Sequence, residues 1–196
     1  MRTIRSHSAS HSSVQAGYSI VEILVVVGII GILSLVAVPQ FMSIYRASLV
    51  KGSLRDFTSM VRKARQIAVT KNERTRITFS TGGAGGATFQ IDEGGNNVLN
   101  PTWTIYQQPH KLDPTTYFDS SSTVPTMSSK REIDFLPGGS IVMPWDSTNP
   151  TAPPVSLPAG QNSIVLRSSV QNLAYNQYAI SVSSLGSLTV TPSKWR

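Results

Sequence analysis

The sequence predicts an α+β protein in which a long N-terminal helix packs on a C-terminal antiparallel β domain. Three observations predict this class. Residues 18–38 form an almost uninterrupted apolar run, residues 40–71 carry apolar side chains at about helical spacing, and from Ile77 onward apolar and polar residues alternate. No helical crossover pattern separates the alternating segments, so the strands are expected to pair antiparallel.

The first element, residues 18–38, is long and apolar enough to span a membrane. Its 21 residues contain one charged residue, Glu22. A helix rises 1.5 Å per residue, so this run covers roughly 30 Å, the thickness of a bilayer core. A secretory signal has a shorter apolar core and a small-residue cleavage site after it, whereas Pro39 follows this run. A membrane-spanning helix is therefore favoured.

Glu22 is the unusual residue of this run. A carboxylate costs roughly 2.5–3.5 kcal/mol at the centre of a span and less near an end. Two interpretations stay open: the side chain extends to the lipid headgroups, or it pairs with a cation. The nearest candidate cation would be a new amino terminus, if the chain were cut after Gly17. Basic residues flank both ends of the run, so their count does not set its orientation.

Residues 39–71 are expected to continue the helix with one apolar and one polar side. Pro39 lacks a backbone donor and is expected to kink the helix. Lys71 and Asn72 predict the helix end, because a cation is favoured in the last turn and Asn tolerates left-handed geometry. The apolar side is Phe41, Tyr45, Leu49, Leu54, Phe57, Val61, Ala64 and Ile67, and the polar side is Arg55, Ser59, Arg62, Lys63, Gln66 and Thr70.

Residues 72–196 are expected to form the β domain. Residues 183–186 predict the turn of a terminal hairpin, residues 82–86 and 94–97 predict loops, and residues 144–158, with five prolines, predict the longest irregular segment. Each predicted strand has one buried face. The alternating apolar residues are Ile77 and Phe79; Phe89 and Ile91; Trp103 and Ile105; Ile133 and Phe135; Ile164 and Leu166; Tyr178, Ile180 and Val182; and Leu188 and Val190.

The positive charge is concentrated in one stretch. The net charge is +7, yet residues 46–76 hold nine basic and two acidic residues, while residues 77–196 hold six basic and seven acidic ones. A solvated helix face is the favoured interpretation, with nucleic acid, anionic lipid or acidic neighbouring subunits as alternatives. The chain has no cysteine, which excludes disulfides and thiolate metal sites.

The sequence holds no recognisable catalytic constellation, and we expect no enzyme, cofactor or metal. His110 is the single histidine after residue 17 and is expected to lie exposed in a loop. Asp92 and Glu93 are expected in a turn, without the spaced oxygen ligands of a calcium loop. The glycine run of residues 82–86 lacks the Gly-Lys-Ser/Thr ending of a phosphate loop.

The order Gly17, an aromatic Tyr18, Glu22, an apolar run and Pro39 resembles the type III signal of type IV pilins and type II secretion pseudopilins. The resemblance implies that a prepilin peptidase removes a leader of residues 1–17 and methylates the new amine of Tyr18. The usual first residue is Phe, and Tyr18 keeps an aromatic ring. Glu22 would meet the amine of a neighbouring subunit during assembly.

The same resemblance implies the placement of the chain in a bacterial envelope. The N-terminus would be cytoplasmic, residues 18–38 would lie in the inner membrane or the filament core, and residues 72–196 would form a periplasmic domain. The implied partners are the prepilin peptidase, other major and minor pseudopilins or pilins, and the inner-membrane assembly platform.

A narrower resemblance points to one branch of this family. Residues 62–79, where a predicted helix runs directly into a strand, are similar to the GspH/FimT-like branch. The same branch is also similar at residues 134–139 and 178–186. This branch has an N-terminal helix over a two-sheet β domain, and its members are minor subunits near the filament tip. The resemblance implies a minor pseudopilin of a type II secretion system that drives protein export and contacts secreted proteins.

The alternative is a minor type IV pilin, FimT/FimU-like, that acts in pilus assembly or DNA uptake. Some FimT-like members use a Gly-Arg-x-Arg stretch in the final hairpin, but the matching residues 186–189 contain no arginine. The candidate nucleic-acid contacts that remain are Lys194, Trp195 and Arg196, with Trp195 as a stacking surface. Nucleic-acid binding is therefore disfavoured.

Overall fold

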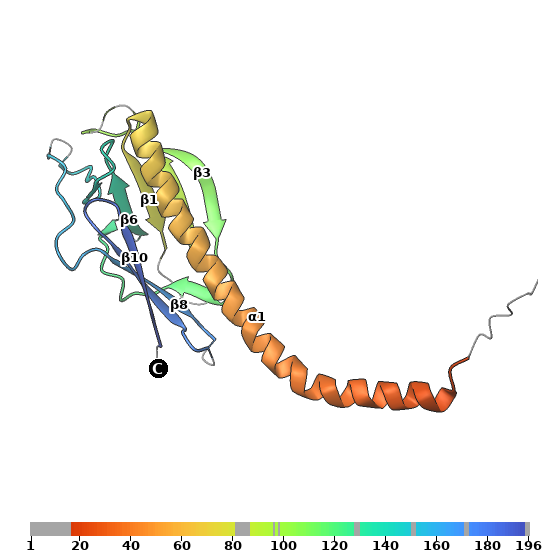
Figure 1. Cartoon of the computed structure of the whole chain (residues 1–196). Coiled ribbons are helices and arrows are strands. Elements are labelled where there is room, and N and C mark those ends of the chain that lie inside the picture. Colours follow the sequence, from red (N-terminus) through yellow and green to blue (C-terminus); the bar gives the residue numbers. More distant parts are fainter. Residues whose placement is uncertain are drawn as a thin grey trace, which may run out of the picture. The chain divides into compact units, whose positions relative to one another are not determined.

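The computed structural model describes residues 17–80, 87–95, 97, 99–127, 130–149, 152–170 and 173–194. The chain divides into two compact units, Met1–Phe41 and Met42–Arg196. Within the described residues one helix is followed by ten strands (Figure 1). In chain order they are α1 (Ile20–Lys71), β1 (Thr75–Phe79), β2 (Thr88–Glu93), β3 (Thr104–Lys111), β4 (Thr116–Phe118), β5 (Thr126–Met127), β6 (Lys130–Phe135), β7 (Ile141–Val142), β8 (Ser163–Ser168), β9 (Gln177–Val182) and β10 (Leu188–Ser193).

Helix α1 begins and ends with recognisable caps. The Ser19 carbonyl accepts the first helical hydrogen bond, from Ile23 N at 3.2 Å. At the other end Asn72 has a φ of 56°, and Glu73 N donates to Ala68 O at 3.2 Å, which is the Schellman pattern. The predicted helix end at Lys71 and Asn72 is therefore confirmed. Pro39 lies inside α1, and the kink predicted there stays a prediction.

The β domain contains two antiparallel sheets. Sheet A has the strand order β3-β2-β1-β6-β5, with β7 also paired to β6, and sheet B has the order β10-β9-β8-β4. All strand pairs are antiparallel, as predicted. Strand β1 is central in sheet A, where Ile77 lies opposite Ile91 of β2 and Ile133 of β6. The α+β class with a long helix on a two-sheet antiparallel domain is confirmed.

The core lies where the second half of α1 meets both sheets. Figure 1 shows this half of the helix lying across the sheet of β1 and β6. The ring of Phe57, fully buried on α1, lies 5.7 Å from that of Phe79, 5.4 Å from that of Phe89 and 4.9 Å from that of Phe118. These rings come from β1, β2 and β4, so one helical side chain joins both sheets. Edge-on aromatic contacts of this kind are favourable.

The predicted burial is wrong at two edge strands. Ile105 on β3 is 56% exposed, and Val190 on β10 is 37% exposed. Both strands have a single strand neighbour in the described part of their sheets, and only Leu188 of the predicted β10 pair packs against the core. An edge strand has a partner on one side only, so its alternating pattern does not guarantee a covered face.

Two position predictions are also corrected. Asp92 and Glu93 lie in strand β2 rather than in a turn. His110 lies in strand β3 rather than in a loop, although its side chain is exposed as expected. Residues 82–86 lie outside the described residues. The irregular segment between β7 and β8 is present as predicted, with one isolated bridge between Val142 and Ser156.

Candidate functional site

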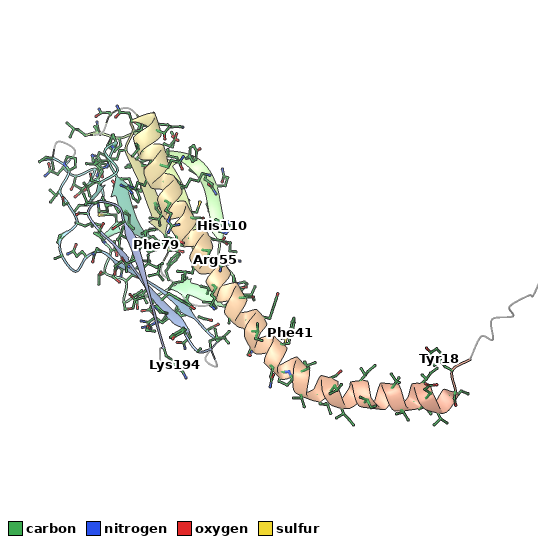
Figure 2. The ribbon with its side chains drawn as sticks, viewed as in Figure 1. Tyr18, Phe41, Arg55, Phe79, His110 and Lys194 are labelled. Carbon is green, nitrogen blue, oxygen red and sulfur yellow. The ribbon has the colours of Figure 1, made fainter. Side chains whose placement is uncertain are left out.

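The N-terminal part of α1 is the first candidate site. Among the described residues, α1 is the one helix whose length and composition suffice to cross a membrane. Every residue of 17–41 is exposed, and Figure 2 shows side chains projecting on all sides of the helix between Tyr18 and Phe41. A helix that is apolar all round is normally buried or membrane-spanning. This segment therefore needs an apolar environment that its own unit does not supply.

Tyr18 and Glu22 lie on one face of this segment. Both line a shallow hollow of about 270 Å³ together with Ile23, Val26 and Val27. Tyr18 lies two residues before the first helical residue, Ile20, so this hollow is at the start of α1. Glu22 also lies in the first turn, where the helix dipole favours a negative charge. Glu22 has no hydrogen-bond or ion-pair partner within the described chain.

The remaining predicted site residues are exposed wherever the structure describes them. Gly17 precedes the helix, and Pro39 lies about five turns beyond the first helical residue, Ile20. Lys194 is exposed just after β10, and Figure 2 labels it at the end of that strand. Trp195 and Arg196 lie outside the described residues.

The basic stretch of residues 46–76 separates into two kinds of cation. Arg55, Arg62 and Lys63 are exposed on α1, as the solvated-face interpretation expects. Arg74 and Arg76 are 2% and 8% exposed, so for them that interpretation is wrong. Two of the nine cations are therefore internal structural charges of the β domain.

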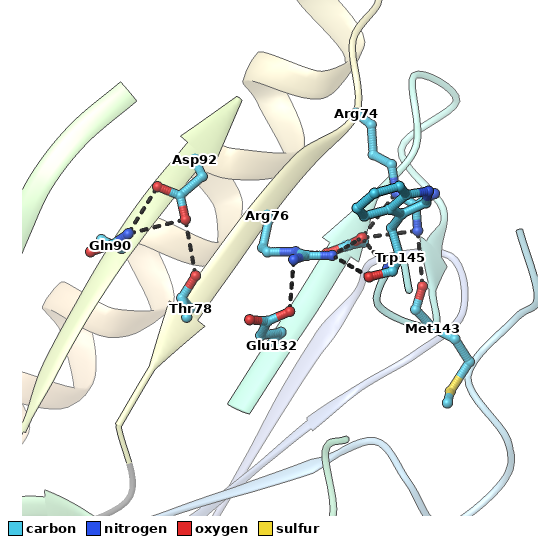
Figure 3. A network of polar contacts seen from close by, with 9 residues as sticks. Arg74, Arg76, Thr78, Gln90, Asp92, Glu132, Met143 and Trp145 are labelled. Carbon is cyan, nitrogen blue, oxygen red and sulfur yellow. Dashed lines mark hydrogen bonds and ion pairs between the residues drawn. The ribbon is translucent and has the colours of Figure 1, made fainter. Parts of the chain in front are cut away.

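The two buried arginines share one carboxylate, that of Asp134. Arg74 Nε and Arg76 Nε lie 2.9 and 2.7 Å from the Asp134 oxygens, and Arg76 lies directly opposite Asp134 in the β1–β6 register. Arg76 NH1 also lies 2.8 Å from Glu132 Oε2 (Figure 3). Burial raises the pKa of Glu132 and lowers the pKa of Arg74. The nearby Asp134 carboxylate acts on Arg74 in the opposite direction and raises its pKa.

This network attaches irregular segments to sheet A. Arg74 donates to Met143 O at 3.0 Å, and Arg76 donates to Trp145 O at 3.2 Å. Trp145 N donates to Asp134 at 2.9 Å, and Trp145 Nε1 donates to Leu99 O at 2.9 Å. The network therefore holds the segment after β7 and the segment before β3 in place. Each charge has a partner, so the arrangement is one of structural support rather than of reactive groups.

The polar pairing around α1 on the side of β3 is also structural. Lys63 Nζ donates to Gln107 Oε1 at 2.7 Å, and Lys71 Nζ lies 2.6 Å from Glu93 Oε1. Lys71 Nζ also lies 4.8 Å above the Tyr106 ring, which is a cation–π contact. Exposed pairs of this kind contribute little to stability because water and salt screen them.

A second candidate site is a groove between α1 and the hairpin of β9 and β10. The hollow has a volume of about 420 Å³, and its wall includes Arg62, Arg65, Gln66, Val69, Gly186 and Leu188. We call it the α1–β10 groove. The sequence alone does not predict this groove, because the groove joins residues more than 100 positions apart. The sequence signal for this groove was the glycine at position 186 in the predicted turn. In the structure the φ of Gly186 is 79°, and a side chain there would meet Arg65.

Comparisons with known proteins add a distant likeness. Scans against protein-family models and against curated proteins find no match. Among solved structures, the chain is similar to the minor pseudopilin EpsH from the type 2 secretion system of Vibrio cholerae. The two share 11% identity and a TM-score of 0.44 over 73% of this chain and 96% of that one. A likeness at this distance carries no argument about binding or activity.

Proposed function

We propose that this chain is a pilin-like subunit, and specifically a minor pseudopilin of a type II secretion system. One observation carries the proposal: an N-terminal helical segment, exposed on every side, whose only charge is Glu22, placed directly after Gly17 and Tyr18. Such a segment is suited first to a bilayer and then to the interior of a helical filament. The β domain would contribute surface contacts rather than catalysis, and we propose no enzymatic activity.

Glu22 is the proposed assembly residue. A carboxylate on an apolar segment costs free energy unless it meets a cation, and Glu22 has none within the described chain. Cleavage after Gly17 would create an amine on Tyr18, which lines the same hollow as Glu22. When a new subunit enters the filament, its Glu22 would pair with the Tyr18 amine of a neighbour. The pairing would favour one axial position of the entering subunit.

The proposal includes a single-pass topology in the bacterial inner membrane. Residues 1–17 would lie in the cytoplasm until the prepilin peptidase removes them, and the β domain would lie in the periplasm. The assembly platform and other pseudopilins would be the partners of the apolar segment. Secreted proteins would meet the β domain.

A minor type IV pilin is the second candidate, because the Gly17, Tyr18 and Glu22 order serves both machines. Within this second candidate, a role in nucleic-acid uptake has less support than a role in pilus assembly. Residues 186–189 contain no arginine, and the exposed Lys194 is a single described cation after β10. Nonspecific binding to a phosphate backbone needs several cations acting together.

The secreted proteome tests the proposal. We would compare a strain lacking the gene with strains carrying Glu22→Ala or, as a matched control, Glu73→Ala, which removes a carboxylate outside the apolar segment. We expect exoproteins to accumulate in the periplasm in the first two strains and to reach the medium in the third. An unchanged medium in all three would exclude the secretion role, and pilus number would then test the second candidate.

A further inference from the structure

The free edge of strand β10 borders the α1–β10 groove. Strand β10 is the first strand of sheet B, and within the described residues it pairs only with β9. Leu188 is both the first residue of β10 and part of the groove wall. The groove therefore opens onto an unpaired strand edge at that residue.

The register shows which β10 backbone groups point toward this free edge. Ser183 N donates across the hairpin to Ser187 O, whereas Val182 N points the other way and donates to Asn162 O. Leu188 lies opposite Val182, so its backbone N–H and C=O point away from β9. Hydrogen-bonded and non-bonded pairs alternate along an antiparallel ladder, so Val190 has the same orientation.

Pro192 is the next outward-facing position and has no N–H. Proline at that point limits an edge strand, because an added strand finds no donor there. The edge thus offers two residues with both a donor and an acceptor, Leu188 and Val190. An incoming strand of three to four residues would satisfy both, by the spacing of the ladder.

The helical wall of the groove is positively charged. Arg62 and Arg65 line it, and Arg55 lies two turns before Arg62 on the same face of α1. Arg65 uses its Nε to donate to Gly139 O at 3.1 Å, while Arg62 has no partner among the described residues. None of the described residues that line the groove carries a carboxylate. A ligand with negative charges at the helix side would complement it.

We propose that the α1–β10 groove binds an extended acidic segment of a partner protein, which adds to sheet B as a strand along the free edge of β10. The backbone of the segment pairs with Leu188 and Val190, and its carboxylates face Arg62 and Arg65. Main-chain bonds supply affinity and the cations select acidic sequences. The proposal concerns only the second half of α1 and the β domain, and it holds whether or not the chain is a filament subunit.

The groove suits a peptide better than a nucleic acid. The outward N–H and C=O groups of Leu188 and Val190 match a second peptide backbone, which presents both a donor and an acceptor at ladder spacing. A single-stranded nucleic acid is held by stacking on aromatic rings along a basic channel, and none of the described residues that line this groove is aromatic.

Fluorescence anisotropy on the full chain in zwitterionic detergent micelles tests the proposal. The probe is a short, end-capped peptide of alternating Glu and Val with a fluorescein label. A Lys/Val peptide and an oligo-dT strand are compared with it. We expect the acidic peptide to bind about tenfold tighter than the basic one. We also expect amide exchange at Leu188 and Val190 to slow when the acidic peptide is bound.

Two variants separate the charge from the strand edge. Arg62→Glu reverses the charge of a groove cation and should weaken binding of the acidic peptide about tenfold. Lys130→Glu, which reverses a cation on β6 outside the groove, is the matched control and should leave this binding unchanged. Val190→Pro removes an outward N–H and should weaken binding of the acidic peptide about fivefold. Val190→Thr retains that N–H and is its control. Circular dichroism checks that each variant is folded. Equal binding of both peptides, unchanged exchange at Leu188 and Val190, or tighter binding of oligo-dT that survives Val190→Pro would each overturn the proposal.

Discussion

The two halves of helix α1 are built for different surroundings. In residues 20–46 every residue is exposed, while from Val50 to Ala68 one stripe is buried and the opposite side is mostly polar. The buried stripe packs on the two sheets of the same chain, with Phe57 at its centre. The first half has no such partner within its unit. One helix thus holds a segment that the fold completes and a segment that another environment must complete.

The carboxylates of the two regions differ in the same way. Asp134 in the β domain is fully buried and is held by Arg74, Arg76 and the backbone N of Trp145. Glu22 on the apolar segment has no partner among the described residues. A buried charge is tolerated when it is paired and hydrogen-bonded. Asp134 is therefore a structural charge of the β domain, whereas under the proposed function Glu22 would meet its partner on a neighbouring subunit.

Phe57→Ala should have the largest effect on the stability of the β domain. The change removes a fully buried ring that contacts Phe79, Phe89 and Phe118. Replacing a buried Phe by Ala costs about 3–5 kcal/mol. Guanidinium unfolding of the full chain in detergent, followed by tryptophan fluorescence, measures it, since Trp103 and Trp145 both lie in the β domain.

Val26→Ala is the matched control on the first half of the helix. Its side chain is exposed, so the free energy of unfolding of the β domain should change by less than about 0.5 kcal/mol. If Val26→Ala destabilised the domain as much as Phe57→Ala, the two halves would share one core. The comparison between them would then fail.

Asp134→Asn should have the next largest effect. The substitution keeps the size of the side chain but leaves the charges of two buried arginines without their shared partner. Breaking a buried ion pair on one side costs about 3–5 kcal/mol, and the amide oxygen recovers part of this. We expect a loss of about 3 kcal/mol in the same unfolding experiment. Glu22→Gln should leave that value unchanged, and an equal loss would mean that Glu22 also has an internal partner.

The sequence was sufficient for the elements with a regular pattern. The helix end at Lys71 and Asn72 followed from local capping chemistry, and the central strands β1 and β6 followed from alternation around Ile77 and Ile133. These features depend on neighbouring residues. Strands β4, β5 and β7 have two or three residues each, which is too short for an alternating pattern to appear.

The buried charges could be predicted only in part. Glu132 and Asp134 are two residues apart on β6 and so lie on one face of it, and Arg76 on β1 and Arg74 just before β1 have the same spacing. Opposite charges at matching positions on two strands predict a pair across the sheet. Their burial depends on the segment of Met143 and Trp145, whose path is set by tertiary contacts. The same holds for the α1–β10 groove, which requires the hairpin to lie beside the helix.

Gly186→Ala should have the smallest of the three destabilising effects and compares two glycines. At Gly186 a Cβ would lie 2.8 Å from both Arg65 Nε and Gly139 O, and the φ of 79° disfavours any side chain. We expect a loss of about 1–3 kcal/mol in the free energy of unfolding of the β domain.

At Gly28, on the apolar segment, a Cβ would meet nothing within 4 Å. Gly28→Ala should therefore leave the unfolding of the domain unchanged and favour the local helix by about 0.5–1 kcal/mol. A destabilised domain in Gly28→Ala would show that the apolar segment packs on its own β domain, whereas loss of assembly with an unchanged domain would place Gly28 against a neighbouring molecule.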